Sequence, residues 1–171
     1  MLFRSKTDLR DLSRVSKSSP RIEAYGTVDE ANALIGTIRP TGHDDLDAVL
    51  EAVQNDLHVV QADLANPDPD EDDPQVSTEQ VEALEDHIDA FDEELEPLRS
   101  FVLPGGGDAG AALHHARTVV RRSERRAVGL AHAEAINETT VTYLNRLSDL
   151  LFTLARVANA RDGELEESPS Y

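Results

Sequence analysis

The sequence predicts an all-α protein: an antiparallel five-helix bundle that forms a single domain. Leu, Ala and Val dominate the apolar residues, while aromatic residues make up only 4% of the chain and Trp is absent. This composition favours helices packed on helices, since strands are enriched in aromatic residues. Apolar residues also recur at three- and four-residue spacing in five segments joined by mostly short connections. A chain of 171 residues is long enough for one domain with a sizeable core.

The first two helices are expected at residues 21–39 and 44–65. Pro40 and Gly42 end the first one, and the second gives way to residues 66–75, where three prolines and five acids predict a solvated, mobile loop. The apolar positions of the two helices are Ile22, Tyr25, Val28, Leu34, Ile35 and Ile38, followed by Leu46, Val49, Val53, Leu57, Val60 and Leu64.

The third helix is expected from Ser77 to about Leu95. Ser77 and Gln80 have the spacing of a capping box, and Pro97 lies beyond the last turn. A glycine turn follows at residues 103–107, LPGGG.

The fourth and fifth helices are expected at residues 111–133 and 137–161, with Asp108 as the N-cap of the fourth. The fourth has its core stripe at Leu113, Ala116, Val120, Ala127 and Leu130, and the fifth at Leu144, Leu147, Leu151 and Leu154. The chain thus divides into an N-terminal segment, 1–20, the bundle domain, 21–161, and an acidic C-terminal tail, 162–171.

The charge is strongly negative, with 34 acidic and 16 basic residues and a formal net charge of −18. Such a surface suits a salt-rich cytoplasm, as in halophiles, because salt screens the self-repulsion; a basic protein partner is the alternative. The negative charge disfavours a nucleic-acid-binding function.

No apolar run approaches the roughly 20 residues that span a bilayer, and the N-terminus does not resemble a signal peptide. The absence of cysteine excludes disulfides and thiolate sites. We therefore expect a cytoplasmic protein without a membrane partner.

Five of the fourteen arginines lie within residues 117–126, RTVVRRSERR. On a helix, Arg117, Arg121 and Glu124 share one face beside the core stripe, whereas Arg122 and Arg126 lie farther around. A guanidinium beside a core requires an anion. Either each arginine pairs with an acid of a neighbouring helix, or the group binds a phosphate or carboxylate ligand.

The remaining candidates are weaker. Asn145 and Asp149 lie one turn apart on the fifth helix, which fits either an interhelical hydrogen bond or a ligand contact, with Arg146 and Phe152 beside them. The LPGGG turn lacks the lysine and the preceding strand of a Walker loop, so a tight turn between helices is its better interpretation. The six histidines have no metal-binding spacing, so no protein metal site is predicted.

Five blocks of the sequence resemble the PduO-type ATP:cob(I)alamin adenosyltransferases, the corrinoid adenosyltransferase family. The resemblance runs in order from about residue 14 to 160. The blocks are RIEAYGTVDEANALIG, QNDLHVVQADLA, FVLPGG, LHHARTVVRRSERR and YLNRLSDLLFTLAR.

The resemblance implies a homotrimer of five-helix bundles with active sites between subunits. The implied reaction transfers the 5′-deoxyadenosyl group of ATP, used with Mg²⁺, to the cobalt of reduced cob(I)alamin and releases triphosphate. A flavoprotein reductase and an adenosylcobalamin-dependent enzyme are the implied protein partners.

The resemblance also implies roles for individual residues. Phe101 matches the aromatic residue that displaces the lower axial base of the corrinoid and leaves cobalt four-coordinate. Asp29 matches an acid that pairs across the subunit interface with Arg117. Arg122 and Asp149 match further interface or structural positions. The implied ATP-site residues are Lys17, Arg117, Arg121, Glu124 and Asn145, and among these Arg117 and Arg121 join Phe101 as catalytic residues.

The chain departs from the family pattern at its start. The family's N-terminal loop, a Thr-Gly-Asp-x-Gly stretch followed by threonine, wraps the ATP phosphates, whereas only Thr7, Asp8 and Leu9 resemble the end of that loop here. Either the start is assigned too late or the phosphate clamp is absent. The alternative function is therefore a catalytically impaired protein of the same fold that binds or delivers a corrinoid.

Overall fold

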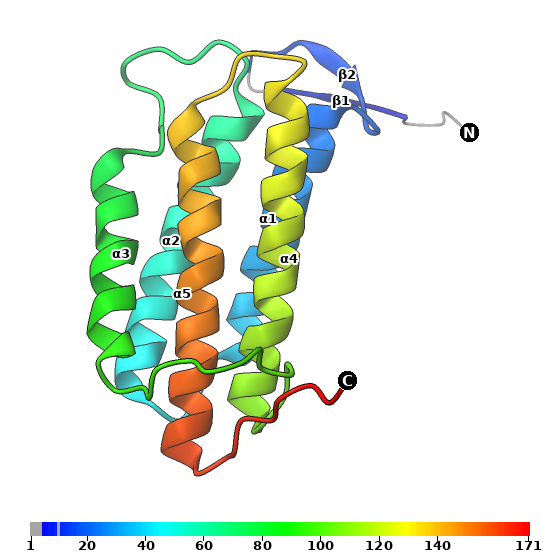
Figure 1. Cartoon of the computed structure of the whole chain (residues 1–171). Helices are drawn as coiled ribbons and strands as arrows, with labels where there is room; N and C mark the ends of the chain where they lie inside the picture. Colours follow the sequence, from blue (N-terminus) through cyan, green and yellow to red (C-terminus); the bar gives the residue numbers. More distant parts are fainter. Residues whose placement is uncertain (1–4, 10) are drawn as a thin grey trace.

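The computed structural model describes residues 5–9 and 11–171, and within this part of the chain five helices run antiparallel in sequence order (Figure 1). They form one mostly helical domain. The helices are α1 (Pro20–Ile38), α2 (Asp44–Ala65), α3 (Thr78–Asp92), α4 (Asp108–Ala131) and α5 (Glu138–Asp162).

Helix α5 lies at the centre of the packing. It contacts α4, α3 and α2, while α1 packs between α4 and α2. The expected leucine stripe of α5 is confirmed, since Leu144, Leu147, Leu151 and Leu154 are fully buried. Burying each leucine side chain contributes about 1.5–3 kcal/mol. The predicted stripe of α4, from Leu113 to Leu130, is likewise buried. Together the two stripes hold α4 and α5 side by side, and this helix pair carries the site described below.

The helix ends agree with the predictions to within one residue except at α3 and α4. The capping box is confirmed, with the Ser77 backbone N–H donating to Gln80 Oε1 at 3.0 Å. Helix α3 ends at Asp92, and its chain continues as turns through Leu95. The prediction that Asp108 caps α4 is wrong. Gly107 is the N-cap and Asp108 is the first helical residue, where the positive end of the helix dipole stabilises a carboxylate.

The expectation of a purely helical chain is also wrong in one respect. A two-stranded antiparallel sheet, β1 (Lys6–Asp8) and β2 (Arg14–Ser16), precedes α1, with Thr7 opposite Val15. Each strand is only three residues long and largely exposed, too short for an alternating pattern to stand out in the sequence. The hairpin lies at the opposite end of the bundle from the C-terminus (Figure 1).

The connection between α3 and α4 and the C-terminal tail lie together at the other end of the bundle (Figure 1). The tail turns back after α5, where Gly163 adopts a positive φ of 75° and ends the helix in the usual left-handed conformation. The backbone N–H of Leu103 then donates to the Glu167 carbonyl at 2.8 Å. The segment that carries Phe101 is thereby held against the end of α5.

Candidate functional site

A hydrogen-bonded chain of polar side chains joins α4 to α5 on one face of the helix pair. The Asn145 amide donates to Glu124 Oε1 at 2.9 Å, and Arg146 donates to the Asn145 oxygen at 2.7 Å. Arg146 also pairs with Asp149 at 2.9 Å. Of the two interpretations left open for Asn145, an interhelical hydrogen bond is therefore confirmed. The contact still leaves Asn145 and Glu124 partly exposed.

Arg117 lies on the same helix pair, and no acid partner of it occurs within the described residues. Its Nε is buried and makes no hydrogen bond within the described residues, and its guanidinium lies over the Phe152 ring, 5.6 Å from the centroid. Burial lowers the pKa of Arg117, the nearby Arg121 charge lowers it further, and Asp149 opposes both effects. A partly desolvated guanidinium without a counter-ion favours binding of an anion such as phosphate.

The five arginines of α4 fall into three groups by the contacts that they make. Arg122 pairs with Glu30, and Arg126 lies 3.5 Å from Glu23, so both join α4 to α1 as neighbouring-helix ion pairs. Arg125 donates to the backbone carbonyl of Arg121 at 3.0 Å. Within the described residues, Arg117 and Arg121 make no ion pair. The interpretation as ordinary ion pairs thus holds for Arg122 and Arg126, while Arg117 and Arg121 are available to a ligand.

A pocket of about 410 Å³ brings Phe101 to the arginine face. Phe101 is 78% exposed, although a phenyl ring of this size is usually buried. The pocket combines one cationic side, at Arg117, with apolar side chains from α5 and from the segment before α4. Its lining residues are Leu98, Ser100, Phe101, Val102, Arg117, Ser148, Asp149 and Phe152. Such a pocket can hold an anionic group beside a flat apolar one.

His114 is a site neighbour that the sequence did not single out. It is 2% exposed, and both ring nitrogens are buried without a hydrogen-bond partner in the described residues. Its ring lies 5.8 Å from that of Phe152, centroid to centroid. Burial lowers the pKa of His114, and the Arg117 charge lowers it further, so the neutral form is favoured. Its position one turn before Arg117 was the available signal.

Lys17 and Asp29 are not in this pocket within one chain. Lys17 follows β2 and is exposed, with its backbone N–H donating to the Ser5 carbonyl at 2.9 Å. Asp29 lies on the exposed side of α1, and no ion pair of Asp29 occurs within residues 5–9 and 11–171. The part of the chain that the structure describes also contains no group of three acidic, histidine or cysteine residues arranged to hold a metal ion.

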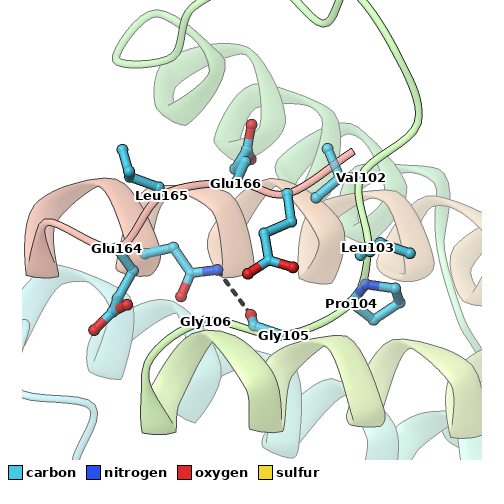
Figure 2. A pocket seen from close by; sticks show the side chains of 10 residues that line it. Val102, Leu103, Pro104, Gly105, Gly106, Glu164, Leu165 and Glu166 are labelled. Atoms are coloured by element: carbon cyan, nitrogen blue, oxygen red, sulfur yellow. Dashed lines mark hydrogen bonds between the residues drawn. The ribbon is translucent and has the colours of Figure 1, made fainter. Parts of the chain in front are cut away.

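The LPGGG segment acts as a turn between helices, as predicted. Asn159 Oδ1 accepts from the Gly107 N–H at 3.0 Å, and its Nδ2 donates to the Gly105 carbonyl at 3.0 Å, the bond drawn in Figure 2. Gly106 has a φ of 101°, and a Cβ at Gly106 or Gly110 would overlap the Asn159 side chain. The glycines therefore allow the start of α4 to approach α5 closely.

None of the helices in the described residues is long and apolar enough to cross a membrane.

Residues 4–158 match the family model described as cobalamin adenosyltransferase. A corrinoid adenosyltransferase of Mycobacterium tuberculosis is 46% identical over 166 residues, which cover 93% of this chain and 86% of the relative. Its counterpart in Bacillus subtilis is 44% identical over 155 residues, or 88% of this chain and 80% of the relative.

Solved structures that resemble this chain belong to the same family. A variant of the PduO-type ATP:corrinoid adenosyltransferase from Lactobacillus reuteri, in complex with cobalamin and ATP, superimposes with a TM-score of 0.92. It is 33% identical, and the match covers 98% of this chain and 96% of that one. A second variant of that enzyme, in complex with ATP, gives a TM-score of 0.90 at 32% identity over the same shares. This chain therefore belongs to the cobalamin adenosyltransferase family and is a corrinoid adenosyltransferase of the PduO type.

Proposed function

We propose that the chain transfers the 5′-deoxyadenosyl group of ATP to the cobalt of cob(I)alamin, yielding adenosylcobalamin and triphosphate. The observation that carries this proposal is the pocket in which the Arg117 guanidinium, which has no ion pair within the described residues, and the exposed Phe101 ring occur together. Its cationic side suits a polyphosphate, and its apolar side suits a corrin macrocycle. A related enzyme has been solved with cobalamin and ATP bound together, which supports both substrates.

The ATP side of the proposed site lies on α4 and α5. Arg117 and Arg121 lack acid partners within the described residues and would bind triphosphate oxygens, because the planar guanidinium matches phosphate geometry. Glu124 and Asn145, already hydrogen-bonded to each other, complete the ATP contacts, and Lys17 supplies another positive charge.

Mg²⁺ fits this site as an ion that enters with ATP. It binds through substrate phosphates together with one or two carboxylates and keeps several waters. Glu124 lies one turn from Arg121 on α4 and is partly exposed, so its carboxylate is the donor that fits beside the triphosphate. When bound, the ion would neutralise part of the charge on the phosphates.

Little covalent chemistry is required of the protein in this reaction. The cobalt(I) electron pair attacks C5′ of ATP, a Co–C bond forms, the C5′–O bond breaks, and that electron pair leaves with triphosphate. Arg117 and Arg121 stabilise the negative charge that develops on the leaving group. Phe101 occupies the side of the corrinoid where the axial base or water would bind. Holding the cobalt and C5′ in line lowers the barrier further.

The active enzyme is proposed to be a homotrimer with sites between subunits. Asp29 is exposed on one chain, and neither Asp29 nor Arg117 makes an ion pair within the described residues, so an ion pair between neighbouring subunits would satisfy both residues. Arg122 and Asp149 lie beside the arginine face and support the arrangement through their pairs with Glu30 and Arg146. A flavoprotein reductase as electron donor and an adenosylcobalamin-dependent enzyme as recipient are the proposed protein partners, and the cytoplasm is the proposed location.

The stoichiometry of the products tests the proposal. The protein would be mixed anaerobically with ATP, Mg²⁺ and chemically reduced cob(I)alamin, and the phosphorus products quantified by ³¹P NMR. We expect one triphosphate for each adenosylcobalamin. Retention of the corrinoid without triphosphate would instead support the alternative of a corrinoid-binding or delivery protein. Phosphate and diphosphate in a one-to-one ratio with adenosylcobalamin would contradict the release of intact triphosphate, and phosphorus products without adenosylcobalamin would contradict transfer at C5′.

A further inference from the structure

The segment that carries Phe101, residues 98–103, separates two cavities, and we call this segment the wall. Leu98, Ser100 and Val102 line the 410 Å³ pocket that contains Arg117, and the same three residues line a second cavity of about 340 Å³. On the far side of the wall, the second cavity is bounded by Arg156 and Glu166. Whatever holds the wall from that side therefore sets the position of Phe101.

Arg156 is the buried charge behind the wall. It lies on α5, is 5% exposed, and its Cζ is 6.0 Å from the centroid of the Phe152 ring, on which Arg117 also rests. Its Nε donates to Glu166 Oε1 at 2.6 Å, and its Nη2 donates to the Glu96 carbonyl at 3.0 Å and to Glu166 Oε2 at 3.3 Å. One guanidinium thus joins α5, the segment before Phe101 and the C-terminal tail.

The tail extends this connection along the wall. The Leu103 N–H donates to the Glu167 carbonyl at 2.8 Å, and the Ser100 and Ser168 hydroxyls lie 2.7 Å apart. Val102 and Leu103 of the wall and Glu164, Leu165 and Glu166 of the tail line one pocket (Figure 2). Because a buried guanidinium is costly without its carboxylate, the Arg156–Glu166 pair favours the tail in this docked position.

We propose that Arg156 is a positioning residue for adenosyl transfer, acting through Glu166 and the tail to hold the Phe101 segment against the corrinoid side of the pocket. This inference rests on the proposed function. Arg156 itself does not line the pocket that contains Arg117 and Phe101. Its effect is on the geometry of Phe101, and it leaves the ATP contacts on the other side of the pocket unchanged.

The first test measures the mobility of the segment directly. The chain has no tryptophan, so Phe101→Trp places a single tryptophan on the wall, and red-edge excitation separates its emission from that of the three tyrosines. In this background, Glu166→Gln is expected to lower the fluorescence anisotropy and increase quenching by acrylamide. Glu164→Gln makes the same charge change in the tail, and the Glu164 carboxylate has no ion pair within the described residues, so it serves as the control. Equal anisotropy in all three proteins would overturn the proposal.

The second test separates the two substrates, with Phe101 retained. Glu166→Gln is expected to lower kcat/KM for the corrinoid by about tenfold to a hundredfold, since a misplacement of about 1 Å can cost about a hundredfold, while KM for ATP stays unchanged. Arg156→Lys should give a similar loss, because Lys cannot make the same set of bonds. A rise in KM for ATP as large as the rise in KM for the corrinoid would point to a general structural effect and contradict the positioning role. If the unmodified chain makes no adenosylcobalamin, the proposed function fails, and the anisotropy result still decides whether Arg156 fixes the segment.

Discussion

The Arg117 guanidinium lies over the Phe152 ring at 5.6 Å and has a buried Nε without a hydrogen-bond partner in the described residues. Burial and the charge of Arg121 both lower the pKa of Arg117, which indicates that its charge is held at a cost to the free protein. Such a residue stabilises a ligand more than it stabilises the fold.

Arg117→Ala is therefore expected to lower the affinity for ATP without lowering the stability of the fold. ATP affinity should fall by about tenfold to a hundredfold, since a hydrogen bond to a charged group contributes about 1.5–3 kcal/mol. The melting temperature of the ligand-free protein, measured on dissociated monomers so that the proposed pair with Asp29 of a neighbouring subunit does not contribute, should not fall, because no ion pair within the described residues of one chain is lost. Isothermal titration and thermal unfolding measure the two effects. Arg122→Ala, which removes an exposed pair with Glu30, is the control and should leave ATP affinity near that of the parent. A large loss of stability in Arg117→Ala would contradict this account.

The two glycines Gly110 and Gly129 of α4 should respond oppositely to alanine. A Cβ at Gly110 would overlap Asn159, so Gly110→Ala is expected to destabilise the protein by about 1–3 kcal/mol. No atom lies within 4 Å of a Cβ built at Gly129, so Gly129→Ala should stabilise it by about 0.5–1 kcal/mol through helix propensity. Denaturant unfolding measures both changes. If Gly110→Ala were as stable as Gly129→Ala, close approach of α4 to Asn159 could not be the reason for the glycine.

The contact between Asp45 and Arg161 predicts that the stability of the fold decreases at low pH. Arg161 hydrogen-bonds to the carboxylate and lowers the pKa of Asp45 from 3.8 to about 2. Since the folded-state pKa is the lower one, the stabilisation is complete above pH 3.8 and is lost as the pH falls towards about 2. Asp45→Asn should therefore lower the melting temperature at pH 5 and have little effect at pH 2, as measured by thermal unfolding across this range. A difference that persists unchanged at pH 2 would contradict the assignment.

The net charge of −18 predicts that salt stabilises the fold. Raising KCl from about 0.1 M to about 1 M shortens the Debye length from about 10 Å to about 3 Å, which screens repulsion among surface carboxylates. The melting temperature should rise over this range, and scanning calorimetry measures it. Choline chloride at equal ionic strength controls for effects specific to K⁺. A melting temperature that falls with KCl would show that ion pairs, such as Arg161 with Glu94, outweigh the repulsion.

The helical framework was predictable because each helix carries its own local signals. The range predicted for α2 agrees residue for residue with Asp44–Ala65, and α5 differs from its prediction only by one residue at each end. The N-cap of α4 could not be predicted correctly, since Gly107 is fixed by its hydrogen bond to Asn159, which lies 52 residues away in the sequence. The hairpin was missed because its strands are short and polar.

The candidate site was only partly predictable. Arg117, Arg121 and Glu124 share a helix face by spacing alone, and the Glu124–Asn145 bond follows once α4 packs against α5. The same spacing gave no means of deciding which arginines have partners, because Arg122 and Arg126 are paired by acids on α1. The pocket at Phe101 depends on contacts between the tail and the α3–α4 connection, which no local pattern encodes.

We propose that adenosyl transfer occurs in the pocket that contains Arg117 and Phe101. The most direct measurement is an anaerobic absorbance assay that follows conversion of chemically reduced cob(I)alamin to adenosylcobalamin, with ATP and Mg²⁺ in high salt. We expect turnover by the unmodified chain and a loss of about a hundredfold or more in kcat for Arg117→Ala, the size of effect seen when a group that stabilises developing charge is removed. Equal turnover by Arg117→Ala, or no turnover by the folded unmodified chain, would contradict the claim.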